Sequence, residues 1–453
     1  MAVFKSIFPF DQQVIAEYPL HDGVTIDKKI SNAAKAFAAW KNFSFSQRAD
    51  VLKKAATILR NDKERFGTLM THEMGKVIAE AKAEAEKCAW TCDYFAEHAE
   101  SFLQDDVIEA GYHQSFVAYQ PIGAVFAVMP WNFPFWQVFR YAVPALMAGN
   151  VTLLKHAPNV TGCSLAIEKI FIDAGAPEGV FQSVIIDIPD VEKIVSSEIV
   201  QGVTLTGSER AGSSLASLAG KHIKKSVMEL GGSDPLIVLP DADMKKAATV
   251  AVQSRMLNAG QSCIAAKRFI VLQNALDDFV QEVSVQIKKL QQGNPFEEGI
   301  TTGSMARLDL AEGLEKQLQQ SLQNGALLNL GGHVDGCNFQ PTLLLNVQKG
   351  MPAFDEEMFG PVASIITVES EGEAITIANQ SRYGLGGSVW TKDVEKGIAV
   401  AKKITTGAVF INSLVKSDPR LPFGGVKKSG YGRELGKLGI HEFVNAKTIA
   451  ADE

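Results

Sequence analysis

The fold is decided by two short apolar runs, Ala124-Val125-Phe126-Ala127-Val128 and Val151-Thr152-Leu153-Leu154. Each has the length of a strand and lacks the polar alternation of a strand with one face in water, so we expect both faces to be buried. Strands of this kind occur in parallel sheets that helices cover. Similar runs follow at 203–205, 237–239 and 269–272, separated by glycines and helical patterns. The sequence therefore predicts an α/β fold with parallel sheets and crossover helices.

The part of the chain before Gly111 is patterned as helix. Apolar side chains recur at helical spacing across 51–59, between Lys and Arg, and the Ala- and Glu-rich run 71–103 continues the pattern. At 453 residues the chain exceeds what one hydrophobic core supports, which predicts two large domains. We place their boundary at 229–232, where a strand-like run ends in two glycines.

Composition and charge narrow the class of protein. The net charge of −7 gives no electrostatic reason to bind nucleic acid or an anionic membrane. No apolar stretch is long enough to span a bilayer and the N-terminus lacks the core of a signal peptide, so we expect a cytoplasmic protein. The five cysteines form no disulfide framework, and Cys88 and Cys92 lack the neighbouring ligands of a metal site, so we expect no metal.

One cysteine has the setting of a nucleophile. Cys263 ends the run Asn258-Ala259-Gly260-Gln261-Ser262-Cys263, where glycine and small polar residues let backbone N–H groups approach a reacting carbonyl. By itself this motif is weak evidence, because a lone cysteine is more often an inert buried side chain.

A carboxylate in a second motif supplies the base that thiol chemistry needs. Glu229 stands in Met228-Glu229-Leu230-Gly231-Gly232, at the end of an apolar run. A partly desolvated carboxylate suits the activation of the water that releases a thioester. The alternative is a surface charge or helix cap beside turn glycines. The sequence has no GxSxG elbow, and none of its eight histidines is obviously placed as the base of a hydrolase.

These motifs make the sequence resemble the aldehyde dehydrogenase superfamily along almost its whole length. Glu229 and Cys263 are 263 − 229 = 34 residues apart, a separation like the family's. Within the superfamily, the sequence looks most like the bacterial succinate semialdehyde dehydrogenases of the Sad type. Seven motifs occur in the family's order: Met129-Pro130-Trp131-Asn132-Phe133-Pro134, Leu154-Lys155, Thr206-Gly207-Ser208, Glu229-Leu230-Gly231-Gly232, Gly260-Gln261-Ser262-Cys263, Glu356-Glu357-Met358-Phe359-Gly360-Pro361 and Pro422-Phe423-Gly424-Gly425.

The resemblance implies a Rossmann-like cofactor domain, an α/β catalytic domain and a small β oligomerisation arm. A projecting hairpin and a C-terminal strand near 444–450 would pair with neighbouring subunits, which implies a homodimer or a homotetramer. The implied ranges are 1–101 and 121–230 for the dinucleotide-binding domain, 231–423 for the catalytic domain, and 102–120 and 424–453 for the arm.

The resemblance also implies the reaction, which is oxidation of an aldehyde to a carboxylate through a thiohemiacetal and a thioester on Cys263. Glu229 would be the general base. The amide of Asn132 and the backbone N–H of Cys263 would hold the oxyanion. Asn132 could otherwise be a turn residue before Phe133 and Pro134.

A nicotinamide dinucleotide is the implied hydride acceptor, although the sequence has no GxGxxG motif. Gly207 and Ser208 open the helix-like run 209–218, whose N-terminus offers N–H groups and a positive dipole to a pyrophosphate. A helix cap at Ser208, a solvated lysine and a solvated pair of glutamates are the structural alternatives. By similarity, the other cofactor contacts are Trp131 on the adenine side, Lys155 at the adenosine ribose, Glu357 at the nicotinamide ribose and Phe359 beside the nicotinamide.

The choice between NAD and NADP depends on the residue three positions after Lys155. NAD-preferring members often carry a glutamate there, which repels a 2′-phosphate, whereas this sequence has Pro158. NADP therefore stays open. The lack of an extra arginine near Lys155 favours NAD.

Two residues indicate an aldehyde that carries a carboxylate. Arg140 lies in the apolar stretch 133–146, where a guanidinium is costly unless an anion meets it. Arg140 and Ser417 match an arginine and a serine of the succinate semialdehyde dehydrogenases. The alternative is that Arg140 pairs with an internal acid.

The sequence also departs from that group. The second arginine that many such enzymes carry is Leu257 here, and whether Arg255, Lys416 or Arg420 replaces it is open. We expect succinate semialdehyde as the substrate, with a broad-specificity aliphatic or aromatic aldehyde dehydrogenase as the alternative.

Two hypotheses that assign the protein to another functional class have less support. A cysteine esterase could use Cys263, Asn132 and Glu229 through one acyl-enzyme, but this leaves the cofactor motifs unexplained. A non-enzymatic subunit predicts loss of the nucleophile or the base, and both are present.

Overall fold

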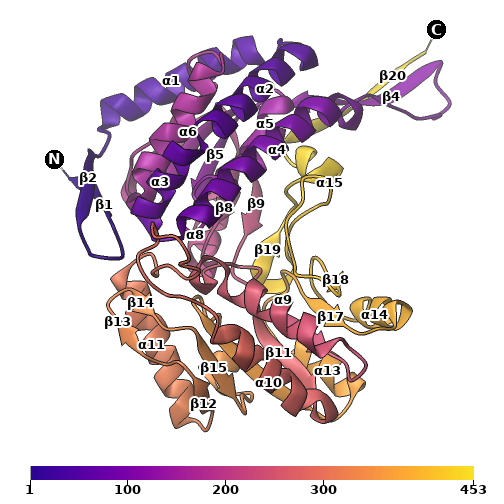
Figure 1. Ribbon diagram of the computed structural model, residues 1–453. Helices are drawn as coiled ribbons and strands as arrows, with labels where there is room; N and C mark the ends of the chain where they lie inside the picture. The colour runs from indigo at the N-terminus through magenta and orange to yellow at the C-terminus, as the bar shows by residue number, and fades with distance from the viewer. Residues whose placement is uncertain (1, 453) are drawn as a thin grey trace.

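The computed structural model describes residues 2–452 as two α/β lobes and a projecting arm (Figure 1). The N-terminal half of the chain forms most of the upper lobe, and the orange segments form the lower one. Within the described residues, no helix is both long and apolar enough to cross a membrane.

The upper lobe is built around a six-stranded sheet, which contains three of the five predicted strands. Its strand order is β19-β9-β8-β5-β6-β7, and all neighbours are parallel except β19 against β9. Every residue of β6 is buried, as a strand covered on both faces requires. The bounds are β5 (Ala124–Met129), β6 (Val151–His156), β7 (Phe181–Ser183), β8 (Val200–Thr206), β9 (Lys225–Glu229) and β19 (Gly430–Tyr431).

Helices cover both faces of this sheet (Figure 1), and two of them carry residues of the cavity described below. The predicted helical run 71–103 is broken, because Gly75 takes a left-handed conformation with φ +79° and ends α3 before α4 begins. The helices of the lobe are α1 (Gly23–Trp40), α2 (Phe45–Asn61), α3 (Lys63–Met74), α4 (Ile78–Phe102), α5 (Trp136–Met147), α6 (Thr161–Asp173), α7 (Val191–Val195) and α8 (Glu209–Lys221).

The lower lobe is built around a seven-stranded sheet that contains the other two predicted strands, β10 and β11. Its order is β12-β15-β16-β11-β10-β17-β18, and only β12 runs antiparallel to its neighbour. The strands are β10 (Asp234–Val238), β11 (Ala266–Leu272), β12 (Leu327–Leu330), β15 (Thr342–Leu345), β16 (Val362–Val368), β17 (Ser388–Trp390) and β18 (Phe410–Ile411). The helices are α9 (Met244–Met256), α10 (Leu276–Ile287), α11 (Leu308–Gln323), α12 (Pro352–Asp355), α13 (Glu371–Asn379) and α14 (Val394–Ala401).

The arm is a three-stranded antiparallel sheet of the order β20-β4-β3. Its central strand β4 (Gln114–Pro121) pairs along its whole length with the C-terminal β20 (Val444–Ala451), and β3 (Asp106–Val107) forms the other edge. β4 and β20 extend away from the upper lobe at the right of Figure 1. The short helix α15 (Gly436–Ile440) leads into β20.

Two small hairpins complete the fold. The first pairs β1 (Val3–Ile7) with β2 (Val14–Pro19) beside the upper lobe, and the second pairs β13 (Val334–Asp335) with β14 (Asn338–Phe339) in the lower lobe. The chain passes from the upper to the lower sheet between Glu229, which ends β9, and Asp234, which begins β10.

Candidate active site

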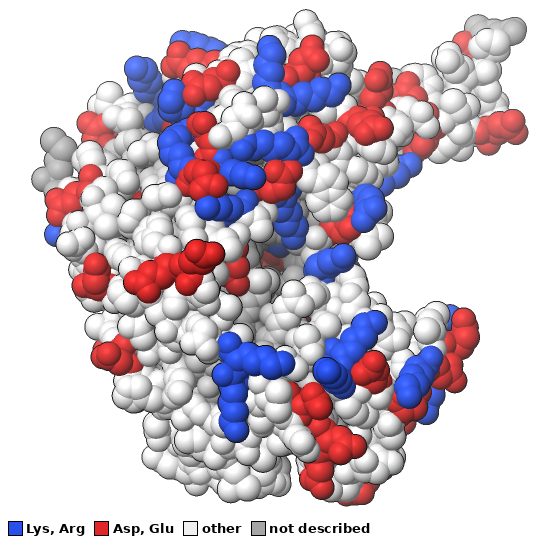
Figure 2. Space-filling view, in the orientation of Figure 1, with Lys and Arg blue, Asp and Glu red and all other residues white. Residues whose placement is uncertain are grey.

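The carboxyl ends of the upper strands meet the amino ends of the lower strands, and the predicted site residues come from both edges. Asn132 follows β5 and Glu229 ends β9, whereas Cys263 precedes β11 and Glu357 precedes β16. The edges are in direct contact, because the Asn132 side chain donates to the backbone oxygen of Gln261 at 3.0 Å. Figure 2 shows the hollow that opens between the two lobes on this face.

The loop before Cys263 has an unusual backbone. Asn258, Ala259 and Gly260 have φ values of +54°, +51° and +73°, the left-handed region that L side chains rarely adopt. Gly260 also packs against Gly360, so that an added Cβ would lie 2.4 Å from the Gly360 carbonyl carbon. Only glycine fits there, because both the conformation and the space exclude a side chain.

Arg255 connects this loop to the segment that carries Glu357. The guanidinium is fully buried, and it donates to the backbone oxygens of Gly260, Met358, Gly360 and Val362. Burial lowers the pKa of Arg255 to about 9, and the charge of Glu357 opposes this shift. Arg255 is therefore part of the framework and does not face the substrate cavity, which answers one of the questions that the sequence left open.

Asn132, which is predicted to hold the oxyanion, contacts the loop that precedes Cys263. Asn132 is buried, and its backbone oxygen accepts a hydrogen bond of 2.7 Å from the Asn258 side chain. Within residues 2–452, the backbone N–H of Cys263 has no acceptor. This N–H and the amide of Asn132 are therefore donors that could form an oxyanion hole.

Glu229 is buried with no hydrogen-bond donor on either carboxylate oxygen among the described residues. Burial raises the pKa of Glu229 well above its ordinary value, and the Arg140 cation opposes this shift while Glu434 adds to it. A carboxyl group without partners in the interior is expensive unless it works on a ligand. Its raised pKa makes it a stronger base than an exposed glutamate.

Cys263 is partly exposed to the cavity, and its thiol is free. Burial raises the pKa of Cys263 to about 12, while the cations of Arg140 and Lys267 act in the opposite direction. The ammonium of Lys267 donates to the backbone oxygens of Ser262 and Cys263 at 2.8 Å each. The thiol therefore needs a base before it can attack a carbonyl.

Three of the predicted cofactor residues lie at the carboxyl ends of β6 and β8 in the upper lobe. Lys155 is 8% exposed, burial lowers its pKa, and no described carboxylate forms an ion pair with it. Ser208 caps α8, since its side chain accepts from the backbone N–H of Ala211 at 3.3 Å. Gly207 precedes it and donates to the backbone oxygen of Glu229 at 2.9 Å. The capping role considered for Ser208 is therefore present.

Glu357, a predicted cofactor residue of the lower lobe, is connected to Cys263 through Lys267. Glu357 accepts from the backbone N–H of Gly232 at 3.0 Å and forms a 3.2 Å ion pair with Lys267. The rings of Phe359 and Trp131 pack edge to face with their centroids 5.8 Å apart. These two aromatics therefore line the same part of the cleft, whereas the resemblance assigns them to different ends of a dinucleotide.

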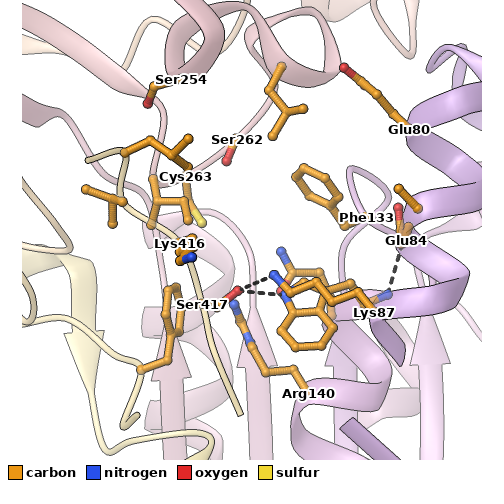
Figure 3. A pocket seen from close by; sticks show the side chains of 18 of the residues that line it. Glu80, Glu84, Lys87, Phe133, Arg140, Ser254, Ser262, Cys263, Lys416 and Ser417 are labelled. Carbon is orange, nitrogen blue, oxygen red and sulfur yellow. Dashed lines mark hydrogen bonds between the residues drawn. The ribbon is translucent and has the colours of Figure 1, made fainter. Parts of the chain in front are cut away.

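A cavity of about 240 Å³ extends from Cys263 between α4, α5 and the loop that contains Ser417 (Figure 3). Its wall is largely apolar, with charged side chains on α4 and α5 and at the loop. The lining residues are Glu80, Ala83, Glu84, Lys87, Phe133, Trp136, Gln137, Arg140, Gln253, Ser254, Leu257, Ser262, Cys263, Ile264, Leu414, Val415, Lys416, Ser417 and Phe423.

Arg140 faces this cavity but has a partner inside the protein. Its Nε donates to the carboxylate of Glu434, its Nη2 donates to Thr206 at 3.2 Å, and the guanidinium lies 4.3 Å from the centre of the Phe423 ring. The internal acid considered as the alternative therefore exists. Within residues 2–452, Nη1 has no acceptor, so part of the guanidinium is free of internal bonds.

Ser417 also lies at the cavity, and the structure adds two neighbours that the sequence did not reveal. Its hydroxyl accepts from Lys87 at 2.9 Å and from the indole N–H of Trp136 at 3.1 Å. Lys416 is exposed at the same cavity, and Arg420 pairs with Asp418 at 2.6 Å outside it. Of the three cations that the sequence left open, only Lys416 therefore lines the cavity.

Sequence reasoning missed Lys87, Lys267 and Glu434. Lys87 repeats at helical spacing with Glu80 and Glu84, but a charged stripe on a helix is usually solvated. Lys267 lies two residues before the predicted run 269–272, and only the longer observed strand β11 includes it. Glu434 carried no local signal, because its importance comes from an ion pair that spans 294 residues.

Comparison with known proteins agrees with this geometry. The model of the aldehyde dehydrogenase family matches residues 2–449, so the chain belongs to the aldehyde dehydrogenase family, as its motifs predicted. The probable NADP(+) succinate-semialdehyde dehydrogenase of Synechocystis sp. is 48% identical over 447 residues, which cover 98% of either chain. The NAD(P)+ succinate semialdehyde dehydrogenase Sad of Escherichia coli is 42% identical over 99% of this chain and 97% of its own.

Solved structures show the same fold. A succinic semialdehyde dehydrogenase from Streptococcus pyogenes in complex with NADP+ superposes with a TM-score of 0.97 at 37% identity, and covers 99% of this chain and all of its own. The names of these relatives give NADP+ or NAD(P)+ as the cofactor. They support a nicotinamide dinucleotide but not the expected preference for NAD.

The contact of Gly260 with Gly360 can be tested by substitution, because the packing of the loop before Cys263 depends on it. We expect Gly260→Ala to lower the free energy of unfolding by about 1–3 kcal/mol through overpacking, and to lower the Tm accordingly. Gly313→Ala is the matched control, because nothing lies within 4 Å of the added Cβ in helix α11 and alanine favours a helix. Thermal unfolding of both variants measures the effect, and an equal or higher Tm for Gly260→Ala would contradict the packing argument.

Proposed function

We propose that this protein oxidises succinate semialdehyde to succinate with NADP as the hydride acceptor. The observation that carries the proposal is that the cavity beginning at Cys263 also holds Arg140 and Ser417, the residues predicted for a substrate carboxylate. The names of the relatives supply the particular aldehyde. The broad-specificity alternative predicts no preference for an aldehyde that carries a carboxylate.

The chain's own groups are arranged for acyl chemistry on a thiol. Glu229 takes the thiol proton of Cys263 and passes it to solvent. The thiolate Sγ then attacks the aldehyde carbon, and the oxyanion is held by the Asn132 amide and the Cys263 backbone N–H. After the hydride has left, the carbon is held as a thioester. Glu229 then takes a proton from water, the water oxygen bonds to the acyl carbon, and the Cys263 thiolate leaves.

The cleft residues fit a dinucleotide. Lys155 is a largely buried cation without an ion-pair partner in the described chain. Helix α8, which Ser208 caps, has its N-terminus at the same carboxyl edge of the sheet. Glu357 offers acceptor oxygens for ribose hydroxyls next to the nucleophile. When bound, the nicotinamide supplies the acceptor for the hydride of the aldehyde carbon.

The absence of an acidic residue three positions after Lys155 favours NADP. Pro158 stands where a glutamate would repel a 2′-phosphate, and the first residue of the short helix at Pro158–Val160 carries no charge. The names of the relatives support the same cofactor.

We also infer that the arm serves assembly of identical subunits. Val107 and Tyr112 of the arm are 81% and 52% exposed, and β3 and β20 both leave a sheet edge unpaired in the single chain. We further propose a dinucleotide-binding domain around the upper sheet, a catalytic domain around the lower sheet, and an arm. The range 424–453 given to the arm includes β19, which pairs with β9 of the upper sheet and belongs there instead.

The reaction is tested by the absorbance of reduced cofactor at 340 nm. We expect rapid reduction of NADP with succinate semialdehyde, slower reduction with butanal and benzaldehyde, and none with Cys263→Ala, because no other described thiol lines the cavity. Cys163→Ala is the control, since that thiol is fully buried elsewhere. Hydrolysis of an ester without any reduction of cofactor would favour the esterase, and equal rates with all aldehydes would favour broad specificity.

The raised pKa of Glu229 predicts the pH dependence of thioester hydrolysis. A glutamate acts as a base only when ionised, so the rate should rise with pH through the raised pKa and then level off. Glu229→Gln should lower this rate by about 100- to 10,000-fold and remove the rise. Rapid-quench measurement of the acyl-enzyme gives the rate.

Glu80→Gln is the matched control for this experiment. Glu80 lines the same cavity, and burial raises its pKa to about 7, but it accepts from the backbone N–H of Asn258 rather than facing an unfilled site. The rise with pH should therefore persist in Glu80→Gln. Its loss there, with a normal rise in Glu229→Gln, would assign the base to Glu80 instead.

Cofactor choice is tested at Pro158. Pro158→Glu should lower kcat/KM for NADP by about tenfold or more, because a like charge is placed near the 2′-phosphate, and should change kcat/KM for NAD much less. Pro158→Gln controls for the loss of the proline ring. Equal losses for NADP in both variants, or a wild-type preference for NAD, would contradict the proposed NADP site.

A further inference from the structure

Lys87 places a second positive charge at the inner wall of the cavity. It lies on α4, its ammonium donates to Ser417 at 2.9 Å, and it stands 4.0 Å from the centre of the Trp136 ring. Lys87 and Arg140 approach Ser417 from neighbouring helices, across the cavity from Cys263 (Figure 3). The indole edge, the hydroxyl and the two cations form one polar corner in an otherwise apolar wall.

The charge of Lys87 is not neutralised within the described chain. The nearest acid on its own helix, Glu84, is occupied by the Lys76 ammonium and by the backbone N–H groups of Phe135 and Trp136. On the loop side, Asp418 is occupied by Arg420. A partly buried ammonium without an ion-pair partner is costly, and an anionic ligand would remove that cost.

Ser417 is oriented by the two donors that it receives. A serine hydroxyl has two acceptor positions and one proton, and Lys87 and Trp136 occupy the acceptor positions. The hydroxyl proton must therefore point to a third atom. Within residues 2–452, this hydroxyl donates to no acceptor, so the proton is available to a ligand in the cavity.

We propose that Lys87 is a specificity-determining residue, which acts with Ser417 and Arg140 to bind the carboxylate of an aldehyde substrate. This inference rests on the proposed function and adds a residue to it. A carboxylate only accepts hydrogen bonds, and this corner only donates them. Lys87 thereby supplies the second cation where many related enzymes have an arginine and this chain has Leu257, which also lines the cavity.

Lys87→Met tests the proposal, because methionine keeps the apolar stem against Trp136 and removes the charge. We expect kcat/KM for succinate semialdehyde to fall about 10- to 100-fold, the range for one lost hydrogen bond to a charged group. The fall should be in KM, and kcat/KM for butanal should change much less. Lys82→Met is the matched control, because it removes a positive charge from the same helix at a side chain that does not line the cavity.

The pH dependence gives a second readout. Burial and the Arg140 cation lower the pKa of Lys87 to about 8, while Glu84 and Asp418 oppose this. As pH rises through 8, the ammonium loses its proton, so the preference for succinate semialdehyde over butanal should fall in the wild type and stay flat in Lys87→Met. Other charged groups around the site are Arg60, Glu80, Glu86, Arg140, Lys416 and Arg420.

The ratio of kcat/KM for the two aldehydes cancels the titration of Cys263 and Glu229, which both substrates share. A ratio that falls equally with pH in Lys87→Met, or a variant that loses both aldehydes alike, would overturn the role of Lys87. If the wild type oxidises butanal but not succinate semialdehyde, the proposed substrate fails and this inference fails with it. If succinate semialdehyde is oxidised and only the Lys87→Met result is negative, the proposed function stands.

Discussion

The carbonyl oxygens around the buried Arg255 guanidinium set the geometry on which the cleft depends. They come from Gly260, before the nucleophile, and from the segment that carries Glu357. Because Gly260 lies directly against Gly360, neither loop can move without the other. The position of the Cys263 thiol relative to the Glu357 carboxylate is therefore fixed by the packing of both loops rather than by one flexible loop.

The electrostatic arrangement of the cleft follows from that framework. Three cations, Lys155, Lys87 and Arg140, keep donors free of internal partners, whereas Glu229 keeps acceptors free. Burial makes each of these groups costly in the empty protein. Ligand groups that use these free donors and acceptors would offset this cost.

Sequence reasoning predicted the parallel strands correctly, because these depend on local pattern. The residues that it predicted as nucleophile, base and oxyanion donor lie at one cleft, and their roles stay predictions. It did not reach the break at Gly75, since a glycine inside a helical pattern is tolerated more often than it ends a helix. It also left the partner of Arg140 undecided. Glu434 lies far along the chain, and no local pattern pairs two residues at such a separation.

By itself, the sequence determined the α/β class and the family, because burial patterns and short motifs depend on neighbouring residues. It also predicted roles for Cys263, Glu229 and Asn132. Only the tertiary structure decided that the carboxyl edge of one sheet meets the amino edge of the other. That meeting places Lys87 of α4 beside Ser417, which lies 330 positions further along the chain. Which charges share a cavity depends on how the helices pack and how the chain crosses between the sheets. This packing is the sum of many weak contacts, so no single residue in the sequence indicates it.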